Sequence, residues 1–575
     1  MAGRNRELAV LFERIADAYE LKGENGFRTL SYRRAARVLL DLAEDVAALD
    51  AGDRLETVDG IGRGIAAKIH EYLATGKMKK LAEVTAGLPD GLFELLTLQG
   101  LGPKGVKLLY DRLQVSSVAD LKQALRSGAV AGLPGFGVKK AANLGRALKL
   151  HELSGERMYL NEATELAAGV TAFLDGAPAV GRCTAAGSLR RGRETVGDID
   201  ILATGRSPQR VVERFLGHPD ITEILARGST KASALFRTPA GPRQVDLRVV
   251  PAPSWGAALQ YFTGSAAHNV ALRGLARDKG LKLSEYGVFR GNRKVAGRTE
   301  EEVYRALGLA PVEPELREDR GEVAAAAAGG LPGLVEPGDI RADLHVHTSE
   351  SDGSATIEQM VAECRRLGYT HLAVTEHSAS AGYAGGLDND GLERLCDRVD
   401  RLNAKLRGFR VLKGSEVDIT PDGGLDYPDR LLARLDVVVC SIHQAFRKNA
   451  TERMCGAIDH PLTSIIGHPT GRIIGRREGY DIDIEKVIDA AARRGKVLEI
   501  NSFYGRLDLS DVRAREALRA GVKLAVNTDA HSVVDLGWMK YGVTTARRAW
   551  ATRDDIINCL TLRRLLALLQ KMRRS

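Results

Sequence analysis

The chain has 575 residues and a formal net charge of +9, from 83 Lys and Arg against 74 Asp and Glu. At roughly 100–200 residues per domain this length predicts several domains, and a hydrophobic content of 44% excludes a mostly disordered chain. The sequence has no apolar run of about 18 residues and no CxxC pair, which argues against a transmembrane helix and a disulfide framework and favours a reducing cytoplasm.

The first 150 residues, mildly basic, predict helices joined by short turns. One pattern occurs three times, as VDGIGRGIAAKI (58–69), LQGLGPKGVKLL (98–109) and LPGFGVKKAANL (133–144). Its glycines permit a tight turn, and the helix that follows offers free N–H groups to a phosphate oxygen. A single copy fits a plain helix connection, but three copies resemble helix-hairpin-helix motifs that bind the DNA backbone. The candidate DNA contacts are Gly60, Gly62, Gly100, Gly102, Lys104, Gly135, Gly137 and Lys139.

Two alternating carboxylates dominate the middle of the chain. Asp198 and Asp200 lie in GDIDIL and are predicted to share one face of a strand, and Asp246 in RQVDLRVV supplies a third acid. Adjacent carboxylates repel each other unless a cation lies between them, and Mg²⁺ prefers such oxygen ligands. A lone Asp-x-Asp is commonly structural, but Gly187 and Ser188 upstream could hold a triphosphate. The combination predicts metal-dependent phosphoryl transfer.

The stretch GSLRRGRETVGDIDIL, then VDLRVV and YFTGS (261–265), resembles the family X DNA polymerases, the family of DNA polymerase beta. The resemblance covers nearly all of residues 1–310. It implies a lyase-like helical domain with a helix-hairpin-helix at 1–88, fingers at 89–150, a palm at 151–255 and a thumb at 256–310. A Gly- and Ala-rich linker is expected at 311–339.

This resemblance also implies residue roles. Asp198, Asp200 and Asp246 would be the catalytic metal ligands, holding Mg²⁺ or Mn²⁺. Arg273 would contact the template strand. The implied nucleotide contacts are Gly187, Ser188, Arg191, Tyr261, Phe262, Gly264 and Asn269.

Two positions depart from the family pattern. Ala266 replaces an acid beside the incoming nucleotide, and Gly64 replaces a helper lysine near Lys68, the match to the lyase nucleophile. A lysine nucleophile needs a lowered pKa, which neighbouring cations help to provide. Two interpretations of Lys68 therefore stay open, deoxyribose-phosphate lyase and simple phosphate binding.

Eight of the twelve histidines lie after residue 340, most of them at the ends of short apolar runs. Seven strand-like runs, near 342–347, 371–377, 410–417, 436–442, 463–467, 496–500 and 523–528, alternate with helical stretches. This alternation predicts a parallel seven-stranded barrel with its chemistry at one rim. Imidazole with carboxylate suits Zn²⁺, Mn²⁺ or Fe²⁺. The nine candidate ligands are His345, His347, Asp352, His377, Glu416, His443, His468, Asp529 and His531.

This half resembles a PHP (polymerase and histidinol phosphatase) domain over 340–575, with all nine ligand positions intact. The expected fold is therefore multidomain, with an α-helical helix-hairpin-helix region, an α+β nucleotidyltransferase palm with thumb, and an α/β PHP domain built as a distorted seven-stranded barrel. About three divalent metals, Mn²⁺ or Zn²⁺, are implied in the PHP domain. Arg506 could offer a cation to the substrate phosphate.

The leading hypothesis is a monomeric, cytoplasmic DNA repair polymerase at the nucleoid, acting on gapped or primed DNA with deoxynucleoside triphosphates. Its PHP domain would be a Mn²⁺-dependent 3′–5′ exonuclease that could also process blocked 3′ ends or abasic sites. A second hypothesis makes the PHP substrate a small phosphate ester or pyrophosphate. A third, a DNA-binding scaffold with relic sites, conflicts with the intact acids and ligands.

Overall fold

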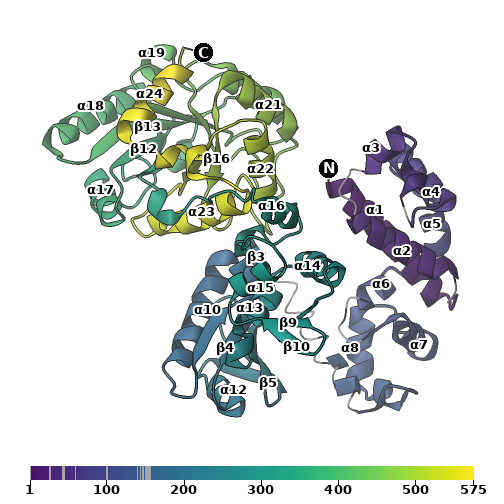
Figure 1. Cartoon of the computed structure of the whole chain (residues 1–575). Helices are drawn as coiled ribbons and strands as arrows, with labels where there is room; N and C mark the ends of the chain where they lie inside the picture. The colour runs from purple at the N-terminus through teal and green to yellow at the C-terminus, as the bar shows by residue number, and fades with distance from the viewer. Residues whose placement is uncertain are drawn as a thin grey trace. The chain divides into compact units, whose positions relative to one another are not determined.

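The protein is described here by a computed structural model, which covers residues 2–24, 27–41, 46–58, 60–96, 98, 101–138, 140–142, 144–145, 148 and 157–574. It consists of two compact units, Met1–Glu156 and Arg157–Ser575 (Figure 1). Among the described residues, no helix is long and apolar enough to cross a membrane.

The first unit is helical, as predicted. Leu8, Phe12 and Ile15 recur at helical spacing and are fully buried. Two apolar cores form, one within residues 8–84 and the other within residues 21–148. The described elements are α1 (Ala2–Leu21), α2 (Phe27–Asp41), α3 (Val46–Ala51), η1 (Leu55–Thr57), α4 (Arg63–Thr75), α5 (Lys79–Thr85), α6 (Gly91–Leu95), α7 (Pro103–Leu113), α8 (Val118–Arg126) and η2 (Ala129–Gly132).

The second unit begins with a five-stranded sheet in the order β2-β4-β7-β6-β5. The central strands β4 and β7 run parallel, with Asp200 opposite Asp246, and their other neighbours run antiparallel. Apolar residues that alternate along β4 and β7 pack against helices α10 and α12. The elements are β1 (Met158–Tyr159), α10 (Leu160–Asp175), β2 (Arg182–Ala185), α11 (Gly187–Arg190), β3 (Thr195–Val196), β4 (Ile199–Thr204), α12 (Pro208–Leu216), β5 (Ile221–Arg227), β6 (Lys231–Phe236) and β7 (Arg243–Val249).

A smaller mixed body follows the sheet. Strands β8, β9 and β10 form an antiparallel sheet, and helices α13, α14 and α15 accompany it. The elements are η3 (Ala252–Ser254), α13 (Trp255–Thr263), α14 (Ala266–Asp278), β8 (Lys282–Ser284), β9 (Gly287–Arg290), β10 (Arg293–Ala296) and α15 (Glu300–Ala306).

Residues 311–339, expected as a linker, are folded and packed. They form η4 (Pro314–Leu316), α16 (Glu322–Ala328) and η5 (Pro337–Asp339). Val312 and Leu316 are buried in the same apolar cluster as α14 and α15. Glu322 is fully buried and pairs with His268 of α14, Oε1 to Nδ1 at 2.6 Å. The connection is therefore part of the preceding body.

The last body is a parallel seven-stranded sheet in chain order, surrounded by helices (Figure 1). The seven predicted strands are all present, and a bridge between Val346 and Ala530 nearly closes the barrel. The strands are β11 (Ala342–Asp343), β12 (His371–His377), β13 (Arg410–Asp418), β14 (Val437–Ser441), β15 (Ile465–Ile466), β16 (Val497–Asn501) and β17 (Leu524–Asn527). The helices are α17 (Ile357–Arg366), η6 (Gly382–Ala384), α18 (Asn389–Lys405), α19 (Asp429–Leu432), α20 (Ala450–Asp459), α21 (Ile484–Arg494), α22 (Asp511–Arg519), η7 (Asp535–Trp538), α23 (Met539–Arg548), η8 (Arg553–Asp555), η9 (Ile557–Cys559) and α24 (Leu562–Met572).

The barrel interior is apolar at one end and polar at the other. Short apolar side chains from the strands pack with Leu565 and Leu569 of α24 in one cluster. Helix α24 thus covers the end opposite to the carboxyl ends of the strands, and the polar side chains gather at those carboxyl ends.

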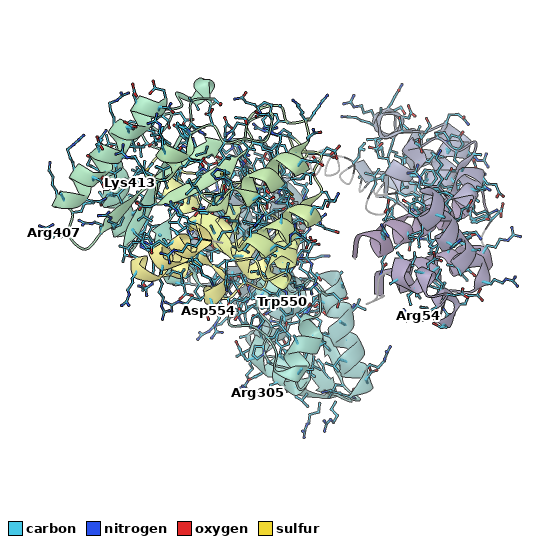
Figure 2. All side chains as sticks on the ribbon, turned by 90° about the horizontal axis from the view of Figure 1, so that it is seen from above. Arg54, Arg305, Arg407, Lys413, Trp550 and Asp554 are labelled. Carbon is cyan, nitrogen blue, oxygen red and sulfur yellow. The ribbon has the colours of Figure 1, made fainter. Side chains whose placement is uncertain are left out.

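Within the second unit, the barrel contacts the preceding bodies. Trp550, which follows α23 and is labelled in Figure 2, packs against the cluster that contains Val312 and Leu316. Arg472 Nη2 donates to Glu194 Oε2 at 2.8 Å, and the Tyr159 hydroxyl donates to the Ile474 carbonyl at 2.9 Å.

Candidate active sites

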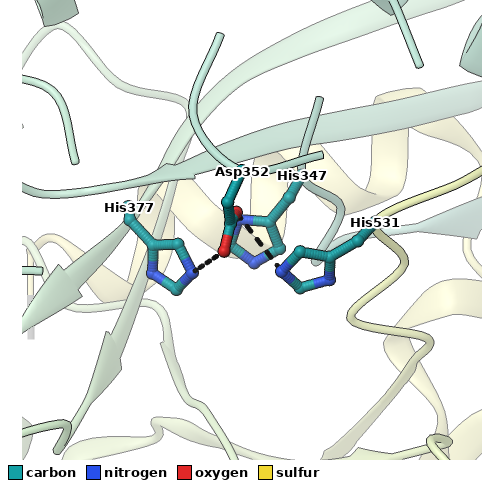
Figure 3. A group of neighbouring side chains, drawn as sticks. All are labelled: His347, Asp352, His377 and His531. Atoms are coloured by element: carbon teal, nitrogen blue, oxygen red, sulfur yellow. Dashed lines mark ion pairs between the residues drawn. The ribbon is translucent and has the colours of Figure 1, made fainter. Parts of the chain in front are cut away.

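All nine predicted metal ligands of the barrel meet at the carboxyl ends of its strands. Seven follow or end a strand, Glu416 lies inside β13, and Asp352 comes from the loop after β11. In Figure 3, Asp352 lies between His377 and His531, with His347 behind it. Asp352 Oδ1 is 3.3 Å from His531 Nε2, and its Oδ2 is 3.6 Å from His377 Nε2.

The ligand atoms form three overlapping groups. One contains His347, Asp352, His377 and His531; a second contains His345, His347 and Asp529; a third contains His377, Glu416 and His443. His468 joins through Glu416, with Nε2 3.0 Å from Oε1. Three groups that share members fit about three neighbouring cations.

The chemistry of these atoms supports metal binding. Among the described residues, ring nitrogens of His345, His347, His377 and His468 and one oxygen of Glu416 are buried without a hydrogen-bond partner. Buried polar atoms normally have partners, and imidazole nitrogens with carboxylate oxygens are the donors that Mn²⁺ and Zn²⁺ take. The residues present therefore fit a cluster of divalent metals.

The electrostatics of the site depend on one carboxylate at its centre. Burial alone would raise the pKa of Glu416, but the imidazoles of His443, His345 and His377 hold it well below its usual range. Burial lowers the pKa of His377, but the carboxylates of Glu416 and Asp352 together outweigh this and raise it to about 10. An anion at Glu416 thus provides negative charge for a cation.

Two buried acids that the sequence reasoning missed orient these histidines. Glu499 of β16 accepts from His345 Nδ1 at 2.8 Å, and Asp418 of β13 lies 2.9 Å from His443 Nδ1. Such contacts fix the tautomer of a metal-binding imidazole, so that Nε2 faces the metal. The sequence signal for Glu499 was weak, an acid between apolar residues of β16, and Asp418 had none, because it ends a strand that already contains other polar residues.

The second cluster of acids lies on the five-stranded sheet. Asp200 of β4 pairs in register with Asp246 of β7, and Asp198 directly precedes β4. Burial and then the carboxylates of Asp198 and Asp246 raise the pKa of Asp200 to about 7. Gln244 Nε2 donates to Asp246 Oδ1 at 2.8 Å, and the Ser233 hydroxyl donates to the same oxygen. Three crowded carboxylates fit divalent cations, which would offset their repulsion.

A glycine turn lies directly against these acids. Gly187 has φ +60°, and a Cβ placed there would lie 2.1 Å from Asp200 Oδ2. Only glycine allows this approach. Ser188 follows on α11, half-buried. Arg191 Nη1 donates to the Thr263 carbonyl at 2.7 Å, which joins this turn to the end of α13.

Comparison with known proteins identifies the family. The family profile described as DNA polymerase beta thumb matches residues 258–318, and the PHP domain profile matches 343–503. Profiles for a helix-hairpin-helix domain and a SAM-like helix-hairpin-helix tandem match 3–78 and 92–149. A Bacillus subtilis (strain 168) protein named DNA polymerase/3′-5′ exonuclease PolX is 37% identical over 98% of this chain and 99% of its own length. The chain belongs to the family X DNA polymerases with a PHP domain.

Other relatives match one half each. Rat DNA polymerase lambda is 30% identical over 55% of this chain and 56% of its own length. A probable phosphatase of Thermoanaerobacter sp. (strain X514) is 33% identical over 38% of this chain and 89% of its own length. The PHP half therefore also resembles proteins that lack the polymerase half.

The other residues expected at the nucleotide site of this family X polymerase lie on α13 and α14. The rings of Tyr261 and Phe262 are perpendicular, with centroids 5.3 Å apart. Asn269 is buried, and its amide donates to the Tyr261 carbonyl at 2.7 Å. Gly264 allows this packing, because a Cβ there would lie 2.9 Å from Asn269 Oδ1. Arg273 is exposed on α14.

Four of the predicted turn glycines of the first unit, Gly62, Gly102, Gly135 and Gly137, are exposed. A Cβ on any of these would meet no atom of the described residues within 4 Å, whereas one at Gly60 would lie 2.8 Å from Val38 Cγ2. Gly62 and Gly102 directly precede α4 and α7. N–H groups in the first turn of each helix are accessible to a phosphate, except at Pro103 of α7, which has none. Lys104 is exposed beside one turn. Gly100 and Lys139 lie outside the described residues.

Lys68 of α4 has a cationic neighbour that the sequence analysis did not identify. Its Nζ donates to the Gly64 carbonyl at 2.7 Å. Burial and then the ammonium of Lys80 lower the pKa of Lys68. Lys80 thus supplies a nearby cation although Gly64 replaces the helper lysine. Arg506 is half-buried in the turn after β16, and its role stays a prediction.

Proposed function

We propose that this protein is a DNA repair polymerase that fills short gaps, and that its PHP domain is a 3′–5′ exonuclease that trims or repairs primer ends. The observation that carries the polymerase half is the contact of the Gly187 turn with Asp200, beside Asp246. The turn that we propose to bind the triphosphate therefore lies against the carboxylate cluster. The relative named DNA polymerase/3′-5′ exonuclease PolX, aligned over nearly the whole chain, supports both activities in one chain.

In the proposed polymerase reaction, Asp198, Asp200 and Asp246 hold Mg²⁺ or Mn²⁺, which would neutralise charge on the triphosphate and lower the pKa of the attacking 3′-hydroxyl. Ser188 and Arg191 bind the phosphates by charge-assisted hydrogen bonds. Gln244 and Ser233 fix the Asp246 carboxylate, which orients the primer end. Tyr261 and Phe262 pack against the incoming sugar. The glycine turns hold the DNA backbone without reading sequence.

In the proposed exonuclease, the nine ligands hold about three cations, Mn²⁺ or Zn²⁺, which would activate water and stabilise charge on the scissile phosphate. Glu499 and Asp418 keep His345 and His443 oriented. A phosphodiester at a DNA end is the proposed substrate, because the glycine turns proposed to bind DNA are in the same chain. We also propose that the protein acts as a monomer and is located at the nucleoid.

A second candidate for the PHP half is a phosphatase of small phosphate esters or pyrophosphate. It is favoured by relatives named probable phosphatase, which align with this half over 89% of their own length. The two candidates differ in whether the substrate is a DNA end.

The test is a gel assay with a 5′-labelled primer on a one-nucleotide gap, in Mg²⁺ or Mn²⁺, with and without nucleotides. We expect the primer to lengthen with nucleotides and to shorten without them. Asp200→Asn should remove only lengthening, and His345→Gln only shortening, so each variant controls the other. A primer that never shortens, with phosphate released from a free nucleotide, would favour the second candidate. Absence of lengthening in wild-type protein would contradict the polymerase assignment.

A further inference from the structure

A buried arginine of the PHP domain contacts the turn that carries Arg191. Arg548, the last residue of α23, has only 4% of its side chain exposed. Its Nη1 donates to the Arg191 backbone carbonyl at 2.6 Å. The helix lies close to this turn, because a Cβ on Gly192 would be 2.1 Å from Thr544 Cγ2. The barrel thus forms one wall behind the proposed triphosphate-binding turn.

The same arginine shares a carboxylate with Arg191. Glu318, from the folded connection, accepts through Oε1 from Arg548 Nη1 and from Arg191 Nε, each at 3.1 Å. The Arg191 and Glu318 side chains are 13% and 11% exposed. Arg548 is held in turn by Asp511 of α22, with Nη2 2.8 Å from Oδ2. A chain of charged contacts therefore runs from the barrel to Arg191.

These contacts fix the plane of the Arg191 guanidinium. Its Nε is held by Glu318 and its Nη1 by the Thr263 carbonyl. Burial raises the pKa of Glu318, but Arg548, Arg191 and Arg193 outweigh it and lower the pKa, so the group is a carboxylate. A guanidinium held at two edges loses little rotational freedom when it binds a phosphate. Glu318 Oε1 is shared between Arg548 and Arg191, so its attraction to Arg191 is weaker than in an isolated ion pair.

We propose that Arg548 of the PHP domain and Glu318 of the connection are positioning residues of the polymerase, and that they preorganise Arg191 for the triphosphate. This inference rests on the proposed polymerase function. Without Arg548, Glu318 would pair fully with Arg191 and compete with the phosphates. Without the Glu318 carboxylate, Arg191 would lose its orientation. Both changes would weaken triphosphate binding in a site to which the PHP domain contributes no ligand.

The test is single-nucleotide insertion into a gapped duplex by the full-length protein, with KM for the nucleotide and kcat measured separately. We expect Arg548→Gln and Glu318→Gln each to raise KM roughly tenfold, the size of about one lost hydrogen bond to a charged group. The value of kcat should stay within about twofold, because the reacting atoms are untouched. Arg548→Lys keeps the positive charge, so its KM should lie between those of the wild type and Arg548→Gln.

Arg547→Gln is the matched control. Arg547 is the neighbouring residue on α23 and is similarly buried, but it pairs with Glu315 and Glu336 rather than with the Arg191 turn. It should leave KM unchanged. Equal KM values for Arg548→Gln and Arg547→Gln would overturn the proposal, and so would a lowered KM in Glu318→Gln, which would make Glu318 a competitor of the triphosphate. Inactive wild-type protein would instead refute the proposed polymerase function.

Discussion

Replacement of Gly187 by alanine tests the packing of the phosphate-binding turn on the carboxylate cluster. The new Cβ would lie 2.1 Å from Asp200 Oδ2, whereas real contacts of this kind are not closer than 3.0 Å. Asp200 or the turn must therefore move by about 0.9 Å. A misplacement of about 1 Å at a reacting centre can lower the rate about 100-fold. We expect Gly187→Ala to lose about this factor in nucleotide insertion.

The stability change is predicted separately. An alanine at φ +60° is in the left-handed region, which costs about 1–2 kcal/mol of folding free energy. Gly169→Ala is the matched control, because Gly169 lies inside α10 and a Cβ there meets nothing within 4 Å. This control should leave insertion unchanged and raise stability by up to about 1 kcal/mol.

The assay is primer extension and primer shortening on the same preparations, with unfolding followed by circular dichroism. Gly187→Ala should retain primer shortening, because the ligand cluster of the barrel is separate from the turn. Insertion within about twofold of wild type would refute the reasoning, since the carboxylate would then tolerate the added methyl group without loss of function.

Three further predictions concern single side chains. Glu499→Gln should lower Mn²⁺ affinity and primer shortening about 10- to 100-fold by releasing His345, with unchanged insertion as its control; an unaltered Mn²⁺ titration would contradict it. In chelator-treated protein, the pKa of Asp200 is higher in the folded state than in the unfolded state, so the folded state binds this proton more tightly. The free energy of unfolding therefore falls as the pH rises from about 4 to about 7, where folding requires Asp200 to lose that proton or keep it at a cost. Asp200→Asn should therefore raise the melting temperature at about pH 8 without metal, and no change there would refute the assigned pKa. Borohydride trapping on a 5′-deoxyribose phosphate end distinguishes the two interpretations of Lys68: a lyase nucleophile predicts trapping that Lys68→Ala abolishes and Lys77→Ala retains, and trapping that survives in Lys68→Ala would contradict the lyase role.

The fold could be predicted from the sequence where the pattern is local. Six of the seven barrel strands are short runs that contain, or are closely followed by, a predicted histidine or acid ligand, and only β16 (VLEIN) ends in Asn501. The seven strands and the meeting of the nine predicted ligands could therefore be predicted from these positions. The palm acids were similarly marked by alternation around Asp200. The structure places Asp198 just before β4 rather than within it, because the chain bends there before the strand ladder begins.

Contacts between distant segments could not be predicted. Glu499 precedes an apolar residue in a buried strand, and nothing local distinguishes its contact with His345 from an ordinary polar position. The pairing of Glu318 with Arg548 joins residues 230 positions apart. The Ala- and Gly-rich composition of 311–339 indicated a linker between two bodies, but spaced apolar residues such as Leu316 and Val335 bury it against its neighbours.

The packed connection has a consequence for how the second unit unfolds. Its apolar residues complete one core, and Trp550 of the barrel packs against that same core. Cutting the chain near residue 340 would therefore leave apolar surface on both fragments, where a flexible tether would leave none. Residues 157–574 should melt in one cooperative transition, with calorimetric and van't Hoff enthalpies that agree. Separate expression of the two halves should give fragments that aggregate, so the two activities are better separated by point substitution than by truncation.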